Sequence, residues 1–165
     1  MIETATVQVG TPDDIDQLMA LSAEACDENG FVAPKPEMIL EQIWSALNQD
    51  AGLVGKITAP DGTIEGAILL RITKLFYSDQ PVLEEKGLFV HPDYRSGKLG
   101  RARMLIEFAK NSAKSLDLPL LIGVLSNTRT EAKIRLYERQ FGGPAGVFFL
   151  YNAKTGVSGS TLATE

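Results

Sequence analysis

Cysteine and histidine are almost absent from this chain, which has one of each among its 165 residues, Cys26 and His91. A single cysteine cannot form an intrachain disulfide, so a small disulfide-stapled fold is excluded. Zinc fingers and two-histidine zinc motifs need several Cys or His ligands and are excluded as well. No carboxylate spacing matches a calcium-binding EF-hand loop. We therefore expect no metal cofactor.

Basic residues and long hydrophobic runs are also scarce. Lys and Arg number 16 against 21 Asp and Glu, a net charge of −5. Non-specific nucleic-acid binding needs a basic footprint, so we expect no nucleic-acid partner. No apolar run approaches the ~18 residues of a membrane span, and the first ten residues lack the regions of a signal peptide. These absences predict a cytoplasmic protein without membrane association.

The composition that remains is typical of one soluble domain, with 44% hydrophobic and 22% charged residues. A chain of this length can bury about two-thirds of its unfolded surface, which is enough for a stable core without disulfide bonds or structural metal ions. No internal repeat is visible. We expect one domain over residues 1–152 and a polar, disordered tail over residues 153–165.

Hydrophobic periodicity and turn residues predict the order β-α-α-β-β-β-α-β-α-β. Antiparallel hairpins come first and strand–helix–strand units follow, which indicates a mixed, mostly antiparallel α/β sheet with helices on both faces. The first half of the chain is expected to contain a strand 4–9, a helix that starts at Thr11 and ends before Asn29, a helix 37–49, and strands 53–58, 63–76 and 82–90. The second half is expected to contain a helix 100–116, a strand 119–125, a helix 128–140 and a strand 145–151. The strand 119–125 is expected to be buried on both faces.

The loop after the strand 82–90 carries the strongest chemical signal. A glycine-bearing loop opens a helix there, and backbone N–H groups at a helix start form an anion site. Neither the P-loop pattern nor Gly-x-Gly-x-x-Gly is present. The segment is locally basic in an acidic chain, with Arg95, Lys98, Arg101 and Arg103 against only Asp93. We expect a phosphate-bearing ligand, and a solvated basic turn is the alternative.

Two longer stretches resemble the GNAT superfamily of N-acetyltransferases. LFVHPDYRSGKLGRARMLIEFA resembles motif A, V-x-P-x-[YF]-[RQ]-x-x-G-x-G/A, with matches at Val90, Pro92, Tyr94, Arg95 and Gly100. SNTRTEAKIRLYERQFGG resembles motif B, where an asparagine precedes A-x-x-L-Y-x-x-x-G-F, with matches at Asn127, Leu136, Tyr137 and Gly142. The expected element order is also that of the family. The resemblance covers residues 4–151 and the motifs cover residues 82–143.

The resemblance implies acetyl-CoA as co-substrate and direct attack of an amine on its thioester. Backbone groups of Leu88, Phe89 and Val90 would pair with the pantetheine arm, and Asn127 would contact it through its side chain. Backbone amides would cradle the pyrophosphate over Arg95, Ser96, Gly97, Lys98, Leu99, Gly100 and Arg101. The family has a glycine where Lys98 stands, and this lysine could add a cation to the site or block close approach of the phosphate.

The resemblance also implies two catalytic residues. Tyr137 occupies the position of the general acid, and a phenol with a reference pKa of ~10 can protonate the leaving thiolate; a packed helix residue is the alternative. Some family members have a catalytic glutamate where Glu84 stands. Strand alternation places Glu84 on one face with Leu88 and turns Glu85 the other way. A solvated strand end is the alternative for both glutamates.

Three other conspicuous residues are expected to have structural roles only. His91 is expected to be a loop residue, Cys26 a small buried hydrophobe, and Trp44 part of the core. By resemblance, the loop from Phe31 to Pro36 lines the acceptor site.

The leading hypothesis is an acetyl-CoA-dependent N-acyltransferase that acts on a small-molecule or protein amine. A non-catalytic GNAT-like module that binds CoA or regulates a partner is the alternative, and an unrelated phosphate-binding α/β domain is a third. The sequence identifies neither the acceptor nor the acyl-chain length. A homodimer is compatible with the sequence.

Overall fold

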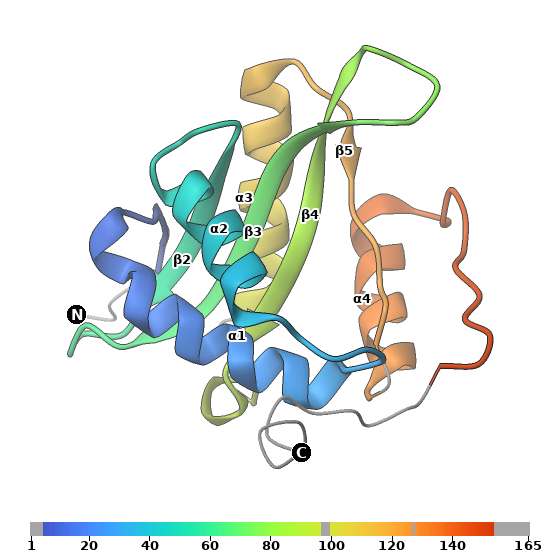
Figure 1. Cartoon of the computed structure of the whole chain (residues 1–165). Helices are drawn as coiled ribbons and strands as arrows, with labels where there is room; N and C mark the ends of the chain where they lie inside the picture. The colour runs from blue at the N-terminus through green and yellow to red at the C-terminus, as the bar shows by residue number, and fades with distance from the viewer. Residues whose placement is uncertain (1–4, 97–99, 127, 154–165) are drawn as a thin grey trace.

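A computed structural model describes residues 5–96, 100–126 and 128–153 (Figure 1). It confirms a mixed α/β fold. The elements are β1 (Val7–Val9), the short 3-10 helix η1 (Pro12–Asp14), α1 (Ile15–Asn29), α2 (Pro36–Leu47), β2 (Gly52–Thr58), β3 (Ile64–Lys74), β4 (Pro81–Val90), the 3-10 helix η2 (Pro92–Tyr94), α3 (Arg101–Leu116), β5 (Leu120–Leu121) and α4 (Thr130–Phe141). No helix of the described ranges is long and apolar enough to cross a membrane.

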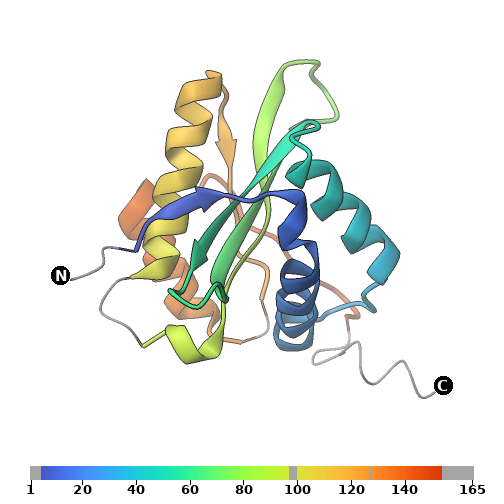
Figure 2. The same cartoon turned by 90° about the vertical axis from the view of Figure 1, so that its left-hand side faces the viewer.

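The five strands form one sheet in the order β1-β2-β3-β4-β5. The first three pairings are antiparallel, as the hairpin pattern predicted. β4 and β5 are parallel, with Leu83 opposite Leu120, because α3 carries the chain back along the sheet between them. Figure 2 shows α1 and α2 on one face of the sheet, with α3 and α4 on the other.

Strand alternation divides the apolar residues between two cores. On the face covered by α1 and α2, Leu18, Ile43 and Leu47 pack with Val54, Ala67 and Phe89. On the face covered by α3, the fully buried Leu105 and Ala109 pack with Ile68, Leu70 and Leu83. Residues directly opposite each other on β3 and β4 point to the same face of the sheet, and successive residues of one strand point to opposite faces. The face of any residue on β3 or β4 therefore follows from the core to which its opposite or adjacent residue belongs.

The turn between β2 and β3 lies between the predicted strands 53–58 and 63–76, whereas α4 begins later than predicted. Gly62 has φ of 90°, and the Asp61 carboxylate accepts a hydrogen bond from the Thr63 N–H at 2.9 Å. The helix predicted to begin at residue 128 begins at Thr130, and Arg129, which precedes it, has the left-handed conformation with φ of 54°. The core prediction for Trp44 is also wrong, because its side chain lies on the outer surface of α2 and is 48% exposed.

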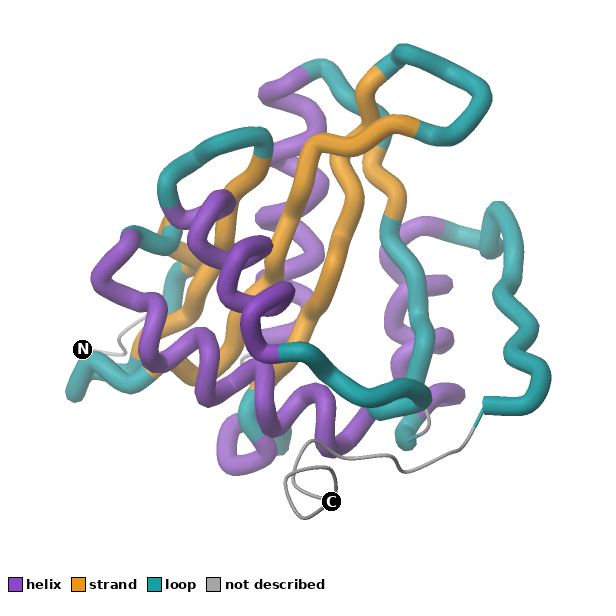
Figure 3. The backbone as a smooth tube through the Cα atoms, viewed as in Figure 1, coloured by secondary structure: helices purple, strands orange, loops and turns teal. Residues whose placement is uncertain are grey.

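The last third of the chain departs most from the sequence prediction. The expected strand 119–125 is reduced to Leu120–Leu121, and Leu121 and Leu125 are exposed rather than buried. The expected strand 145–151 pairs with no strand among the described residues and is exposed throughout. An apolar run predicts burial, but the pairing of β5 with β4 ends at Leu121, and the chain beyond it is a loop (Figure 3).

Candidate active site

A β-bulge in β4 sets the geometry of the site. Glu85 lies opposite Leu70 and Gly87 opposite Leu69, so Lys86 is an extra residue without a partner on β3. The bulge interrupts the alternation of side chains. Leu83 and Leu88 therefore contact the same core beneath α3. Glu84, next to Leu83, points to the opposite face, so the expectation that Glu84 and Leu88 share a face is wrong.

The second edge of β4 is open beyond the bulge. β5 pairs with β4 only at Leu83 and Glu84, and no strand of the described part adjoins Gly87–Val90 on that side. Leu88, Phe89 and Val90, the residues predicted to hold the pantetheine arm, lie along this open edge. Alternate residues of an antiparallel strand direct their N–H and C=O groups away from the paired neighbour. The edge can therefore accept an extended ligand as an added strand.

Arg95, predicted to lie in the pyrophosphate loop, ties three elements together. Its guanidinium makes two hydrogen bonds to the Glu28 carboxylate of α1, at 2.8 and 2.6 Å. Its Nε donates to the Val90 carbonyl at 2.8 Å, and the charge lies 4.9 Å from the centre of the Phe89 ring. The Arg95 backbone N–H donates to Pro92. The Arg95 side chain thus braces the loop against β4 and α1.

Arg101 is held in a similar way at the first position of α3. Its Nε donates to the buried carboxylate of Glu65 on β3, and its second nitrogen donates to the Tyr94 carbonyl at 3.0 Å. The guanidinium also lies 5.1 Å from the Tyr94 ring centre. Both of these basic side chains are therefore paired with carboxylates within the fold, and the backbone N–H groups at the start of α3 are groups that can bind an anion.

The remaining residues predicted for the phosphate loop are only partly described. Ser96 is exposed, and Gly100 adopts the left-handed conformation with φ of 58° immediately before α3. This conformation is one that glycine adopts at little cost. Gly97, Lys98, Leu99 and the pantetheine contact Asn127 lie outside the described residues. Their predicted roles stay predictions.

Glu85 on β4 and Tyr137 on α4 are close enough for the Glu85 charge to act on the Tyr137 phenol. Burial raises the pKa of Glu85 to about 7, and the charge of Glu84 adds to this shift; the Gly123 amide, which donates a hydrogen bond, and the charges of Lys133 and Lys86 oppose it. Burial, and then the Glu85 charge, raise the pKa of the Tyr137 phenol. The pair thus places a carboxyl group that titrates near neutrality beside a phenol that stays protonated.

Glu84, the base that the resemblance implied, has different surroundings. Burial acts to raise its pKa, but hydrogen bonds from Lys86 at 2.9 Å and Thr73 at 2.8 Å, with the Lys86 charge, outweigh burial and lower the pKa overall. Glu84 is therefore an ion-paired carboxylate on the face of β4 that points away from α3. Its catalytic role stays a prediction.

Lys133 on α4 joins the site to α1. Its Nζ donates to Asn29 Oδ1 at 3.0 Å and to Ser126 Oγ at 2.9 Å. Burial, followed by the neighbouring arginines Arg95 and Arg129, lowers its pKa, while Glu28 and Glu85 oppose this shift. This contact brings the end of α1, and hence the loop over residues 31–36, beside the turn that precedes α4 (Figure 1).

Sequence reasoning missed Glu28, Glu85 and Lys133. A glycine inside a strand is a signal of a bulge, and Gly87 directly after Glu85 and Lys86 could have indicated that the alternation breaks there. Lys133 stands three residues before Leu136, where motif B has alanine. No sequence signal pairs Glu28 with Arg95, which lie 67 positions apart.

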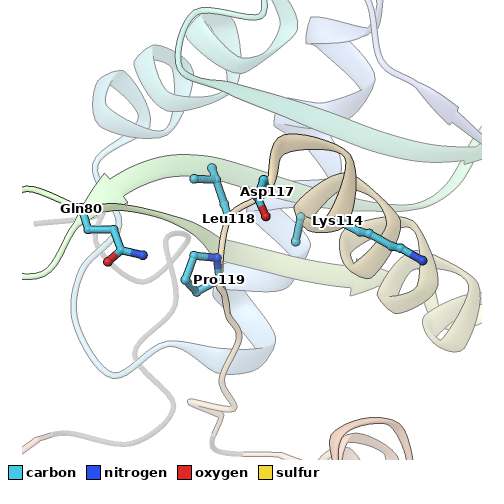
Figure 4. A pocket seen from close by; sticks show the side chains of 6 residues that line it. Gln80, Lys114, Asp117, Leu118 and Pro119 are labelled. Carbon is cyan, nitrogen blue, oxygen red and sulfur yellow. The ribbon is translucent and has the colours of Figure 1, made fainter.

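A surface hollow lies at the other end of α3, away from these residues. It is lined by Gln80, Lys114, Asp117, Leu118 and Pro119, together with Ala113 (Figure 4). None of the residues predicted for cofactor or acceptor binding contributes to it. The hollow is separate from the candidate site at the open edge of β4.

Comparison with known proteins agrees with this arrangement. The model of the acetyltransferase (GNAT) family matches residues 17–142. Among solved structures, a possible acetyltransferase from Clostridium difficile 630 is similar at 13% identity with a TM-score of 0.67, over 91% of this chain and 98% of that one. AAC(6′)-Iy in complex with the bisubstrate analogue CoA-S-monomethyl-acetylneamine is similar at 16% identity with a TM-score of 0.67 and the same coverage.

The ribosomal-protein-alanine N-acetyltransferase from Brucella melitensis biovar Abortus is also similar, at 15% identity with a TM-score of 0.65, over 90% of this chain and 98% of that one. At these identities the likeness shows a shared fold. No curated protein sequence matches the chain.

Proposed function

The chain belongs to the GNAT acetyltransferase family, and from that premise we propose that it transfers an acetyl group from acetyl-CoA to a primary amine by direct attack. The observation that carries the proposal is that the charge of Glu85 on β4 acts on the phenol of Tyr137 on α4, which motif B also singles out. Amine acetylation needs a base that accepts the proton of the amine and an acid that protonates the leaving thiolate, and Glu85 and Tyr137 have separated pKa values that suit these two roles.

The backbone supports acetyl-CoA as the co-substrate. The open edge of Leu88–Val90 fits the amide-bearing pantetheine arm, and the N–H groups at the start of α3, after Gly100, fit the pyrophosphate. The side chains of Arg95 and Arg101 contribute indirectly, because their carboxylate partners hold the loop and the helix start in place. The bound thioester supplies the acetyl group, and an N–H group of β4 polarises its carbonyl.

The two titrating residues then divide the proton transfers. An aliphatic amine arrives as an ammonium ion at neutral pH, so it must lose a proton before its nitrogen can attack. Glu85, whose pKa is about 7, accepts this proton, directly or through water. When the carbon–sulfur bond breaks, the Tyr137 phenol protonates the departing thiolate. The acetylated amine and free CoA are the products.

We expect the Glu85→Gln variant to lose the acidic limb of the pH–rate profile. In the wild-type protein kcat/KM should rise with pH through a midpoint near 7, because the ionised carboxylate is the active form. Glutamine cannot accept the proton, so activity should fall and this ionisation should vanish. The rate of thiol release, measured from pH 5.5 to 9, tests the expectation.

The matched control is Glu84→Gln, which changes the neighbouring carboxylate on the opposite face of β4. We expect this variant to keep the wild-type midpoint, because Glu84 is paired with Lys86 and Thr73. The reverse result, with the midpoint lost in Glu84→Gln and kept in Glu85→Gln, would return the role of base to Glu84.

Two measurements test the proposed function as a whole. Calorimetry with acetyl-CoA tests binding. Thiol release with a panel of acceptors tests turnover, and the panel should include an aminoglycoside and an alanine-terminated peptide, since similar structures carry those names. Binding without turnover on any acceptor would favour a non-catalytic CoA-binding module. Absence of binding at millimolar acetyl-CoA would contradict both functions.

A further inference from the structure

The outer surface of the layer formed by α1 and α2 carries the single tryptophan of the chain, Trp44. This side chain is 48% exposed, and Leu40, one turn earlier on α2, is 44% exposed. Both line a hollow of about 540 Å³ between the start of α1 and α2, which we call the Trp44 hollow. Its lining residues are Ile15, Asp16, Glu37, Leu40, Glu41 and Trp44. Sites for small molecules typically have volumes of ~300–1,000 Å³.

Three carboxylates accompany the apolar side chains of the Trp44 hollow. Asp16 of α1 and Glu37 and Glu41 of α2 are all exposed, and no lysine or arginine of the described ranges lines the hollow. Lys56, whose ammonium group contacts this end of α1, is already paired with Asp14 at 2.7 Å. The hollow therefore combines an aromatic and aliphatic surface with three negative charges, and it is complementary to an apolar cation.

Helix chemistry explains two of these carboxylates but not the third. Asp16 and Glu37 lie in the first turns of α1 and α2, where the helix dipole favours negative charge. Glu41 lies four residues after Glu37, and like charges at this spacing destabilise a helix. Trp44 follows Glu41 by three residues, so the two side chains share one face of α2. A cation bound there would relieve the repulsion and cover the exposed indole.

We propose that the Trp44 hollow binds a small organic cation with an apolar body, an alkylammonium ion in chemical class. The ammonium group lies beside Glu41 and against the indole of Trp44, since the face of an aromatic ring attracts cations. The alkyl body covers Leu40 and Ile15, and burial of this apolar surface favours it over an inorganic cation. An anion of the same shape would be repelled by the three carboxylates.

This site is distinct from the candidate active site. None of the residues proposed for catalysis or cofactor binding lines the Trp44 hollow. Ile15 begins α1 and lies about 20 Å along the helix axis from Glu28, which contacts the loop after β4. Binding in the hollow therefore needs neither acetyl-CoA nor turnover, and its test is independent of the proposed transferase activity.

Fluorescence of the single tryptophan reports on this site directly. Titration of the full chain with hexyltrimethylammonium should change the emission of Trp44 and reach saturation in the millimolar range. Hexanesulfonate, which has the same alkyl body and the opposite charge, should leave the emission unchanged. Added salt should weaken the binding of hexyltrimethylammonium, because interactions between exposed charges are screened.

Two variants assign the binding to the hollow. Glu41→Gln should weaken the affinity for hexyltrimethylammonium by about 2–5-fold, the contribution of an exposed ion pair. Trp44→Leu, measured by calorimetry because it lacks the fluorophore, should weaken it by about 2–30-fold, the contribution of a cation–π contact. The matched control is Glu107→Gln, which removes the same charge from α3 on the opposite face of the sheet (Figure 2). This control should bind like the wild-type chain.

Three results would each overturn the proposal. The first is an emission of Trp44 that hexyltrimethylammonium does not change. The second is equal affinity for hexanesulfonate, which would show an apolar hollow without selection for charge. The third is wild-type affinity in both Glu41→Gln and Trp44→Leu. Both side chains are exposed, so neither substitution should unfold the chain, and circular dichroism verifies this.

Discussion

Replacing Tyr137 with phenylalanine is expected to lower kcat by about 10²–10⁴-fold, the usual contribution of a general acid. The substitution removes one hydroxyl group and keeps the ring, so its contact with Phe141 on α4 should survive. Acetyl-CoA binding should be unchanged, because the predicted cofactor contacts come from β4 and the start of α3. Steady-state thiol release and calorimetry with acetyl-CoA measure the two quantities separately.

The matched control is Tyr77→Phe, at the exposed tip of the hairpin between β3 and β4, which should have wild-type kcat. A further expectation concerns pH. Burial and the Glu85 charge raise the pKa of the Tyr137 phenol, so the wild-type enzyme should retain the protonated acid, and its activity, up to pH 10. Unchanged turnover in Tyr137→Phe would remove this residue from the mechanism.

The largest effect on stability is expected from Arg101→Met. This substitution leaves the Glu65 carboxylate, which is buried on β3, without its guanidinium partner. Breaking one side of a buried ion pair costs about 3–5 kcal/mol, because the remaining charge stays desolvated. The melting temperature should fall by roughly 6–20 °C for a domain of this size. Urea denaturation gives the free energy of unfolding directly.

Two further variants separate the ion pair from the helix position. Arg103→Met changes an exposed arginine in the first turn of the same helix, and the free energy of unfolding should change by about 0.5 kcal/mol or less. Replacing both partners, as Arg101→Met with Glu65→Leu, should restore most of the lost stability, since no buried charge then remains. A single Arg101→Met variant as stable as the wild-type protein would show that the pair is dispensable.

The sequence predicted most elements of the fold because their signals are local. The apolar stripe of the helix 100–116 placed α3 to within one residue, and Pro60, Asp61 and Gly62 placed the hairpin turn between β2 and β3. The two motifs indicated the family and directed attention to β4, the loop after it and α4. Each of these signals spans a few neighbouring residues, where backbone preference and side-chain periodicity act directly.

Other features depended on which segments meet, and the sequence misled there. The run PLLIGVL predicted a strand buried on both faces. The apolar pattern of a run does not show whether its side chains pack into the core of the same chain or lie on its surface. Trp44 falls at a helical spacing typical of the core and lies outside it. Only the packed structure decides such cases, because burial depends on neighbours distant in the chain.

By itself, therefore, the sequence determined the α/β architecture, the order of the elements as far as the last helix and the resemblance to the family, and it directed attention to Tyr137. Tertiary structure alone decided which glutamate accompanies that tyrosine. A single extra residue at Lys86 reverses the alternation of β4 and turns Glu85, rather than Glu84, toward α4. A bulge exists only where two strands pair, so Glu85, which we propose as the proton acceptor, could be chosen only once the pairing of β3 with β4 was known.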